Sequence, residues 1–269
     1  MQRVELPNGF KVSGLNDFEP PVLYHEMFVK RSYLRHGVTL SPGDVVFDVG
    51  ANIGMASLFF HTECPAISVH AFEPGSRTFA ALRENMAEFK VPVTLHNAAV
   101  SDAPGAALFD FYPHCTALSG LHPDPEEATR LTRIYFGNLG FSESDVEELL
   151  VDRFTRETEE CRVTTVSEVI SEWGIGAVGL LKVDVEKSEL AVLRGVRAEH
   201  WPRIRQVVME VHDLDGAGKA AVSLLEEQGF RVTVEQEPLL AGTEVYEVFA
   251  VRPGAAGGPG GPGEPGEPG

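Results

Sequence analysis

DVGANIG, residues Asp48–Gly54, is the stretch of sequence that decides how this chain folds. Its first three residues end the apolar run VVFDVG, Val45–Gly50, which is typical of a strand buried on both faces of a sheet. Its last residues begin a helical pattern at Ile53–His61. Gly50 allows a sharp turn after the strand, and Gly54 permits close packing of helix and strand. The stretch therefore predicts a strand, a tight turn and a helix with a ligand site at its N-terminus.

The residue between the glycines of this loop limits the kind of ligand that it binds. A dinucleotide-binding loop reads G-x-G-x-x-G, and its middle glycine lets the backbone approach a pyrophosphate. Asn52 stands at that position here, so the loop is predicted to bind a ligand without a pyrophosphate. Asp48, near the end of the strand, is placed either to pair with an amine or to order the loop.

Outward from this loop the chain alternates between strands and helices. Further strands are predicted at Ile67–Pro74, Val93–Val100, Ala107–Tyr112, Gly179–Glu186 and Gln206–Asp213, with two closing strands in residues 230–237 and 244–253. Further helices are predicted at Ser76–Phe89, Ser188–Gly195 and Ala217–Gln228, and a short strand with a helix at Val163–Trp173. This alternation predicts an α/β fold with a doubly wound, mostly parallel sheet and helices on both faces.

The two ends of the chain lie outside the alternation. Residues 1–43 are predicted to form an N-terminal cap segment, with a hairpin at Val4–Val12 and a helix from Pro20 to about Arg35. Residues 253–269 are rich in Gly and Pro and have glycine at every third position from Gly254. Five such triplets are too few to hold a collagen helix, so a disordered tail is predicted.

An insertion interrupts the main domain, which spans residues 44–252. Residues 113–160 break the alternation with two predicted helices, Pro125–Leu139 and Ser142–Phe154. Both helices begin at good capping residues. An insertion of this size is expected to form a lid or a wall of the substrate site.

Composition and charge narrow the class of protein. The 269 residues, 43% of them hydrophobic, are enough for one well-filled core. Forty acidic residues against 22 basic ones give a net charge of −18, which disfavours nucleic acid and anionic membranes as partners and favours a small neutral or cationic molecule. Neither a secretory signal nor an apolar membrane span is found, so a cytoplasmic location is expected. The three scattered cysteines predict neither disulfides nor a zinc site.

The ends of the second and third strands carry candidate cofactor contacts. Glu73 follows the glycine loop by about twenty residues, and its two carboxylate oxygens can accept the hydroxyls of a ribose. The third strand ends in NAAVSD, Asn97–Asp102, whose small residues leave room for a flat adenine. Ala99 and Ser101 are therefore predicted to contact the cofactor.

The ends of two later strands carry the candidate chemistry. Strand alternation places Asp184 and Glu186 on one face, and the next strand ends with His212 and Asp213, so all four are expected at one rim. They form an acid/base cluster or, alternatively, a metal site, but their spacing along the sequence favours no metal and none is predicted. His114 of the insertion is a candidate substrate contact. A serine hydrolase is excluded, because the G-x-S-x-G elbow is missing.

Five motifs in order resemble the FkbM family of S-adenosylmethionine-dependent methyltransferases. They are VVFDVGANIG, HAFEP, NAAVSD, GLLKVDVEKSELAVLRG and QVVMEVHD, and the resemblance runs from about Tyr33 to Ala250. It is closest to the macrolide O-methyltransferases of bacterial secondary metabolism. The resemblance implies the seven-stranded class I methyltransferase sheet, which is Rossmann-like, S-adenosylmethionine as methyl donor and a hydroxyl group as acceptor. The expected cofactor contacts are Asp48, Gly50, Asn52, Gly54, Glu73, Ala99, Ser101 and Asp184.

The sequence thus predicts an O-methyltransferase that acts on a hydroxylated polyketide or macrolide. His212 is predicted to take the hydroxyl proton, with Asp184 orienting it, and Glu186 and His114 are predicted to contact the substrate. A sugar hydroxyl remains an alternative acceptor. Two other classes also remain open, a nicotinamide-dependent oxidoreductase on a related fold and a non-catalytic protein that binds S-adenosylmethionine. The sequence predicts no oligomeric state.

Overall fold

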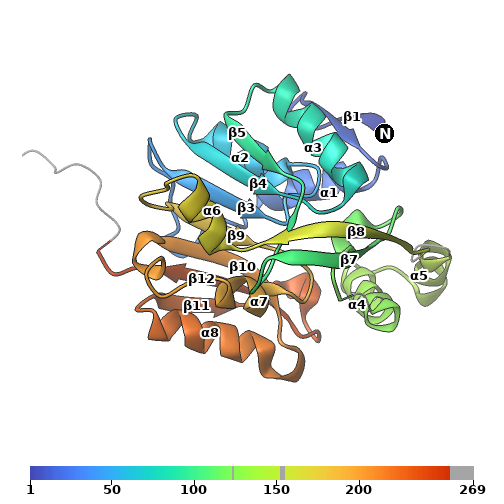
Figure 1. The fold of residues 1–269 in the computed structure, drawn as a ribbon. Helices are drawn as coiled ribbons and strands as arrows, with labels where there is room; N and C mark the ends of the chain where they lie inside the picture. The colour runs from blue at the N-terminus through green and yellow to red at the C-terminus, as the bar shows by residue number, and fades with distance from the viewer. Residues whose placement is uncertain (123, 152–154, 255–269) are drawn as a thin grey trace, which may run out of the picture.

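The computed structural model describes residues 1–122, 124–151 and 155–254, and a seven-stranded sheet lies at its centre (Figure 1). From one edge to the other, its strands are β11 (Arg231–Glu235), β12 (Val245–Val251), β10 (Gln206–His212), β9 (Leu180–Val183), β3 (Val45–Val49), β4 (Ser68–Phe72) and β5 (Val93–His96). β12 runs in the opposite direction to the other six strands of this sheet, which all run the same way. The predicted fold class, an α/β protein with a seven-stranded and mostly parallel sheet, is confirmed.

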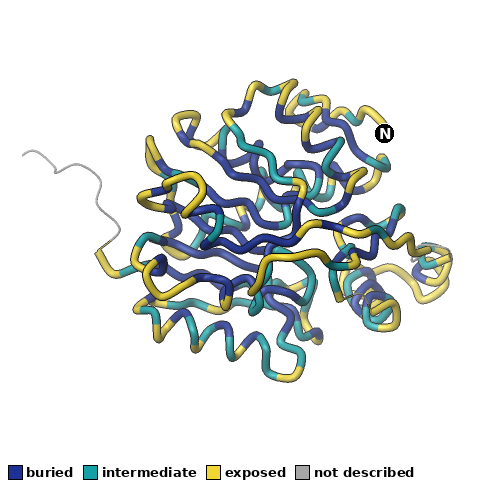
Figure 2. The backbone as a smooth tube through the Cα atoms, viewed as in Figure 1, coloured by how far each residue is buried: buried dark blue, intermediate teal, exposed yellow. Residues whose placement is uncertain are grey.

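Helices cover both faces of the sheet. One face carries α1 (Glu19–Tyr24), the π-helix η1 (His25–Val29), α2 (Met55–Glu63) and α3 (Ser76–Glu88). The other face carries α6 (Val166–Glu172), α7 (Glu189–Arg194) and α8 (Ala217–Glu227). Successive strand residues alternate between the two cores, as Val46 and Phe47 do, so the central strands are apolar on both faces and largely buried (Figure 2). The edge strands β5 and β11 are partly exposed.

The order of the strands places a crevice at the centre of the sheet. β3 pairs with β4 on one side and with β9 on the other, so the chain winds outward in both directions from this point. In open α/β sheets, ligands bind at such a switch point, outside the carboxyl ends of the strands. The loops after β3, β4, β9 and β10 therefore meet at the expected place.

The N-terminal cap contains the predicted hairpin but a shorter helix than expected. β1 (Gln2–Glu5) and β2 (Lys11–Gly14) pair antiparallel, and the backbone of Ser13 is bonded to the side chain of Asn85 in α3. The helix predicted to reach about Arg35 ends at Val29 of η1, so its predicted end was wrong. Arg31 adopts a φ of 57°, which no right-handed helix accommodates.

The predicted strand Val93–Val100 is divided between two sheets. β5 ends at His96, and the Asn97 side chain donates to the carbonyls of Glu73 and Pro74. A second, three-stranded sheet then contains β6 (Ala99–Val100), β8 (Glu157–Thr164) and β7 (Gly105–Phe111), in this order. The prediction of one continuous strand was wrong because the Asn97 contacts turn the chain away from β4.

The insertion projects from the end of the β7–β8 ribbon (Figure 1). It contains the 3₁₀ turn η2 (Thr116–Leu118), α4 (Pro125–Asn138) and α5 (Glu143–Leu150). Asp124 caps α4, and Ser142 forms a capping box with Asp145, so both predicted helix starts are confirmed. The predicted boundary at residue 160 was too late, because β8 already begins at Glu157.

Short 3₁₀ turns complete the fold: η3 (Trp201–Arg203), η4 (Leu214–Gly216) and η5 (Pro238–Leu240). Two predicted features fall on parts of the chain that are not described. The tail predicted for residues 253–269 lies outside the described residues beyond Gly254, and so do the last three residues of the predicted helix Ser142–Phe154. Within the described residues, no helix is both long enough and apolar enough to cross a membrane.

An edge of the central sheet carries two histidines in contact. His70 Nδ1 and His96 Nε2 are 3.1 Å apart, and the His96 ring stacks on Phe72 with ring centroids 4.4 Å apart. Burial, with the neighbouring charge of His70, lowers the pKa of His96 to about 4. In the folded protein His96 therefore binds a proton only at a lower pH than it does in the unfolded chain.

We expect the stability to fall as the pH drops from 6.5, the ordinary value of the imidazole, towards about 4, where the folded His96 also protonates. His96→Phe keeps the stacking and removes the titration, so its melting temperature should fall less steeply over this window. Thermal unfolding from pH 7 to 4.5 measures this, with the exposed His114→Asn as control. If the melting temperatures of wild type and His96→Phe fall equally with pH, His96 is not the group responsible.

Candidate active site

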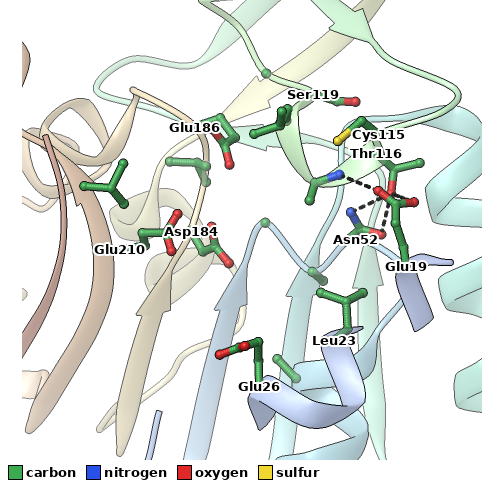
Figure 3. Close-up of a pocket in the computed structure, with 18 of the residues that line it drawn as sticks. Glu19, Leu23, Glu26, Asn52, Cys115, Thr116, Ser119, Asp184, Glu186 and Glu210 are labelled. Carbon is green, nitrogen blue, oxygen red and sulfur yellow. Dashed lines mark hydrogen bonds between the residues drawn. The ribbon is translucent and has the colours of Figure 1, made fainter. Parts of the chain in front are cut away.

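A cavity of about 520 Å³ opens at the carboxyl ends of the central strands (Figure 3). This volume is within the range of roughly 300–1,000 Å³ that small-molecule sites occupy. Its floor is formed by the loops after β3, β4, β9 and β10, and its walls come from α1, η1, α4 and the segment before β12. The predicted cap and insertion thus both line it.

The glycine loop after β3 closely approaches the end of β9. Gly50 has a φ of 76°, and a Cβ at this position would lie 1.7 Å from the carbonyl oxygen of Asp184. Only glycine fits there. Gly54 instead packs α2 against α3, because a Cβ there would lie 2.6 Å from Leu82, and Gly54 does not line the cavity. Of the two loop glycines, only Gly50 is placed to contact a ligand.

Asp48 supports the loop from below. It is fully buried, its Oδ1 lies 3.1 Å from Lys182 Nζ, and its Oδ2 accepts a 2.6 Å bond from the Ser57 hydroxyl. Lys182 Nζ in turn donates to the Gly50 carbonyl at 2.7 Å. Burial works against the ammonium, but the charges of Asp48 and Asp184 outweigh it and raise the pKa of Lys182. The predicted direct contact of Asp48 with the cofactor is therefore corrected: Asp48 orders the loop through Lys182.

Glu73 reaches the cavity with fewer free positions than the sequence predicts. Its Oε1 accepts bonds from the Gly75 N–H at 2.8 Å and the Thr78 hydroxyl at 2.7 Å, and its Oε2 accepts the Asn52 N–H at 2.9 Å. Burial raises its pKa, although these bonds oppose the shift. A carboxylate offers about four acceptor positions. Oε2 alone retains one for a ligand, so of the two oxygens in the predicted ribose contact only Oε2 is available, and the contact itself stays a prediction.

Besides Asp48 and Gly54, three further residues predicted at the site lie outside the cavity lining. Ser101 pairs its backbone N–H with Thr164, while its neighbour Ala99 does line the cavity. His114 is exposed and is not among the residues that line the cavity. Asp213 accepts the Lys219 N–H at the start of α8. For Ser101 and His114 the structure gives no support to the predicted ligand contacts, and Asp213 does not share the rim with the other acids.

The rim beyond β9 is not the regular strand that the sequence suggests. β9 ends at Val183, and Glu186 and Lys187 have φ values of 51° and 70°. Asp184 Oδ2 accepts a 3.0 Å bond from the Tyr33 hydroxyl and lies 3.6 Å from Lys182 Nζ. Asp184 therefore faces the glycine loop after β3 and is held by Tyr33 of the cap.

His212 lies between two glutamates rather than beside Asp184. Its Nε2 is 3.4 Å from Glu186 Oε2, and its Nδ1 is 3.3 Å from Glu189 Oε1. Burial disfavours the imidazolium, but these carboxylates outweigh it and raise the pKa of His212 to about 10. The predicted pairing of His212 with Asp184 was wrong. The predicted role of His212 as the base stays a prediction, and a ring that keeps its proton at neutral pH speaks against it.

Figure 3 shows Glu210, Asp184 and Glu186 converging on the same space. Burial raises the pKa of Glu210 well above its ordinary value and that of Glu186 to about 8. Glu210 was missed, although it is two residues from His212 on one strand and strand alternation places both on the same face. Glu186, a predicted substrate contact, lines the cavity.

Glu19 of the cap is a further residue that the sequence did not reveal. It is buried, its Oε2 accepts the Thr116 hydroxyl at 3.0 Å, and its Oε1 accepts the Ala117 N–H at 3.2 Å. Thr116 also accepts a 3.1 Å bond from the Asn52 side chain. These contacts join the cap, the insertion and the glycine loop, which are far apart in the sequence (Figure 3).

The outer part of the cavity is apolar. Its side chains come from the cap, the insertion and the segment before β12, and include Phe18, Leu23, Leu131, Phe136, Phe141 and Leu240. Three of the aromatic rings meet, with centroids 6.5 Å apart for Phe18 and Phe136 and 5.3 Å for Phe136 and Phe141. A polar floor and an apolar chamber thus share one cavity.

Comparison with known proteins matches residues 48–232 to the Methyltransferase FkbM domain. The chain is 51% identical to the 31-O-demethyl-FK506 methyltransferase FkbM of Streptomyces tacrolimicus, over 94% of this chain and 97% of that protein. It is 37% identical to the AMB antimetabolite synthetase AmbE of Pseudomonas aeruginosa, over 94% of this chain and 12% of the synthetase. It is 30% identical to Methyltransferase 1 of Beauveria bassiana, over 88% of this chain and 92% of that protein.

The buried ion pair beneath the loop should contribute strongly to stability. Lys182→Met leaves Asp48 charged and unpaired in the core, which should cost about 3–5 kcal/mol in the free energy of unfolding. The control Lys219→Met breaks a pair whose lysine side chain is 85% exposed and should cost about 1 kcal/mol or less. Urea unfolding of both variants checks this, and equal losses would disprove the structural role.

Glu73 should contribute to binding of S-adenosylhomocysteine, the demethylated form of the donor. Glu73→Ala removes the remaining acceptor and frees the Asn52 N–H, so affinity should fall by about 1.5–3 kcal/mol, the range for a charged hydrogen bond. Calorimetric titration measures it. Glu159→Ala, which removes an acceptor for Ser76 outside the cavity, is the control. Unchanged affinity in Glu73→Ala would place the ribose elsewhere.

Proposed function

The chain belongs to the FkbM family of methyltransferases, and we propose that it transfers the methyl group of S-adenosylmethionine to a hydroxyl group of a large polyketide-type molecule such as a macrolide. The observation that carries this proposal is that a polar floor and an apolar chamber share one cavity. The nicotinamide-dependent alternative is set aside by the family match. A sugar acceptor fits less well, because the outer chamber offers mainly apolar side chains.

The residues of the floor suit the donor. Gly50 and Asn52 supply backbone close to the cavity, Glu73 supplies one carboxylate oxygen, and Ala99 leaves room beside the floor. S-adenosylmethionine supplies a methyl carbon on a positively charged sulfur, which leaves as a neutral thioether. Acidic side chains predominate around the polar part of the cavity, and they favour a cationic ligand.

The apolar chamber suits a large, weakly polar acceptor. Phe18 of the cap, Leu131 and Phe136 of the insertion, and Leu240 before β12 offer apolar surface on three sides. Removing such surface from water stabilises a complex by roughly 25 cal/mol per Å². The walls also restrict how the acceptor turns, and a large share of the rate of an in-line displacement comes from this alignment.

We assign the acceptor proton to Asp184. Its carboxylate accepts a hydrogen bond from Tyr33 and lies beside the glycine loop. Asp184 also lines the cavity, with its side chain 29% exposed. Both ring nitrogens of His212, by contrast, already face glutamates. In this arrangement the acceptor O–H bond breaks towards Asp184 as the oxygen bonds to the methyl carbon, and the electron pair of the C–S bond stays on sulfur.

Purified protein with S-adenosylmethionine should methylate hydroxylated macrolides and release S-adenosylhomocysteine, both measured by mass spectrometry. Asp184→Asn keeps the shape and removes the base, so turnover should fall by about 10²–10⁴. Affinity for S-adenosylhomocysteine should stay within a few-fold. Asp213→Asn, at the end of the neighbouring strand but outside the cavity, is the control and should keep its turnover.

Two results would contradict the proposal. Methylation of simple sugars without methylation of macrolides would show that the acceptor is a sugar and not a polyketide-type molecule. Turnover of Asp184→Asn close to that of the wild type would remove Asp184 from its role and leave positioning as the source of the rate.

A further inference from the structure

Three side chains at the junction of floor and chamber lie in the arrangement of a metal site. Glu186, from the loop after β9, and Glu210 and His212, from β10, each offer one ligand atom, and these atoms lie within 4.8 Å of one another. All three residues line the cavity. We propose that Glu186, Glu210 and His212 bind a divalent first-row metal ion such as Mn²⁺.

The spacing of the side chains suits a shared ion. Two ligands that are each about 2.1 Å from a metal lie about 3.0–3.4 Å apart in octahedral or tetrahedral geometry. His212 Nε2 and Glu186 Oε2 are 3.4 Å apart, which is long for a hydrogen bond and fits two ligands of one ion. Two carboxylates with one imidazole suit Mn²⁺ or a neighbouring ion, since carboxylates alone would favour Mg²⁺ or Ca²⁺.

The residues behind the cluster orient the imidazole towards it. His212 Nδ1 lies 3.3 Å from Glu189 Oε1, which also accepts the Lys187 N–H at 2.7 Å and is thereby fixed. A carboxylate on the far nitrogen of a histidine is the usual support of a metal ligand, because it sets the tautomer and aims the other nitrogen at the ion. The pair Glu189–His212 supplies this support.

An unsatisfied polar group lies in the same loop. Ser188 lines the cavity and is 3% exposed, and its hydroxyl has no hydrogen-bond partner among the described residues. Buried hydroxyls are normally hydrogen-bonded. A metal ion with its bound water beside this loop would supply such a partner.

Acidic groups outnumber cationic groups at the cluster. Three carboxyl groups, those of Glu186, Glu189 and Glu210, lie around one imidazole. The ammonium of Lys182 is directed to Asp48, to Asp184 and to the Gly50 carbonyl, and none of these belongs to the cluster. Buried carboxylates need paired charge or metal coordination, and a divalent ion supplies the missing positive charge.

The ion would act on the acceptor, and this use rests on the proposed function. A metal that binds the acceptor oxygen lowers the pKa of the hydroxyl. The proton then passes more readily to Asp184, and the metal holds the oxygen in line with the methyl group. Binding of the ion itself does not depend on which acceptor is used.

Titration of chelator-treated protein with MnCl₂, followed by electron paramagnetic resonance of the free ion, tests the site. We expect one saturable site. His212→Ala and Glu210→Gln should weaken it by more than about 100-fold, and Glu189→Gln by about 10–100-fold. Glu26→Gln, which changes a cavity carboxylate paired with Lys30 outside the cluster, should leave the affinity within about twofold and is the matched control. Thermal melting confirms that each variant is folded.

A second titration, with saturating S-adenosylhomocysteine, separates the ion from the donor. Mn²⁺ affinity that is unchanged or higher supports the site. Loss of Mn²⁺ binding by competition would mean that the cluster receives the ammonium of the donor, and would overturn the proposal. The proposal also fails if no saturable binding is seen below about 1 mM or if the cluster variants bind like the wild type. Neither titration uses an acceptor, so such a failure leaves the proposed methyl transfer standing.

Discussion

The ion pair between Lys182 and Asp48 is the interaction on which the rest of the site depends. It joins the two central strands at their carboxyl ends, and the same ammonium binds the carbonyl of Gly50 and approaches Asp184. Removing two charges from water costs free energy, so a buried ion pair stabilises the fold only if both partners are also well hydrogen-bonded. In this protein the ion pair fixes the glycine loop against the end of β9. The α-carbon of Gly50 lies so close to the Asp184 carbonyl that no side chain fits there.

From this fixed point the site extends in two chemical directions. Towards β4 the loop N–H of Asn52 is taken by Glu73, which keeps one oxygen for a ligand. Towards β10 the carboxylates gather around His212, with Glu186 and Glu210 on the cavity side and Glu189 behind. The first direction offers a hydrogen-bond acceptor, as the proposed contact with the donor ribose requires. The second offers acidic groups and an imidazole, as the proposed metal site requires.

Much of this arrangement could be predicted from the sequence, because it rests on local patterns. The apolar strands, the glycine loop and the closing strand pair follow from periodicity and turn chemistry. The errors arise where tertiary contacts override the local pattern. Regular alternation placed Asp184 beside His212, but the chain leaves β9 after Val183 and turns through two residues with positive φ, which brings Glu186 to His212 instead. Glu19 reaches its partners across about a hundred residues of sequence, and no local signal marks it.

The β7–β8 ribbon has a consequence for how such enzymes diversify. The insertion leaves the sheet after Phe111 and returns at Glu157, and these two residues face each other across the ribbon. Because its ends are already held together, lengthening or replacing the segment costs little closure entropy and leaves the register of the seven central strands untouched. The insertion between β7 and β8 can therefore be exchanged, by evolution or by design, without changing the glycine loop or the central sheet. Such an exchange would change the chamber proposed to bind the acceptor and keep the proposed donor site.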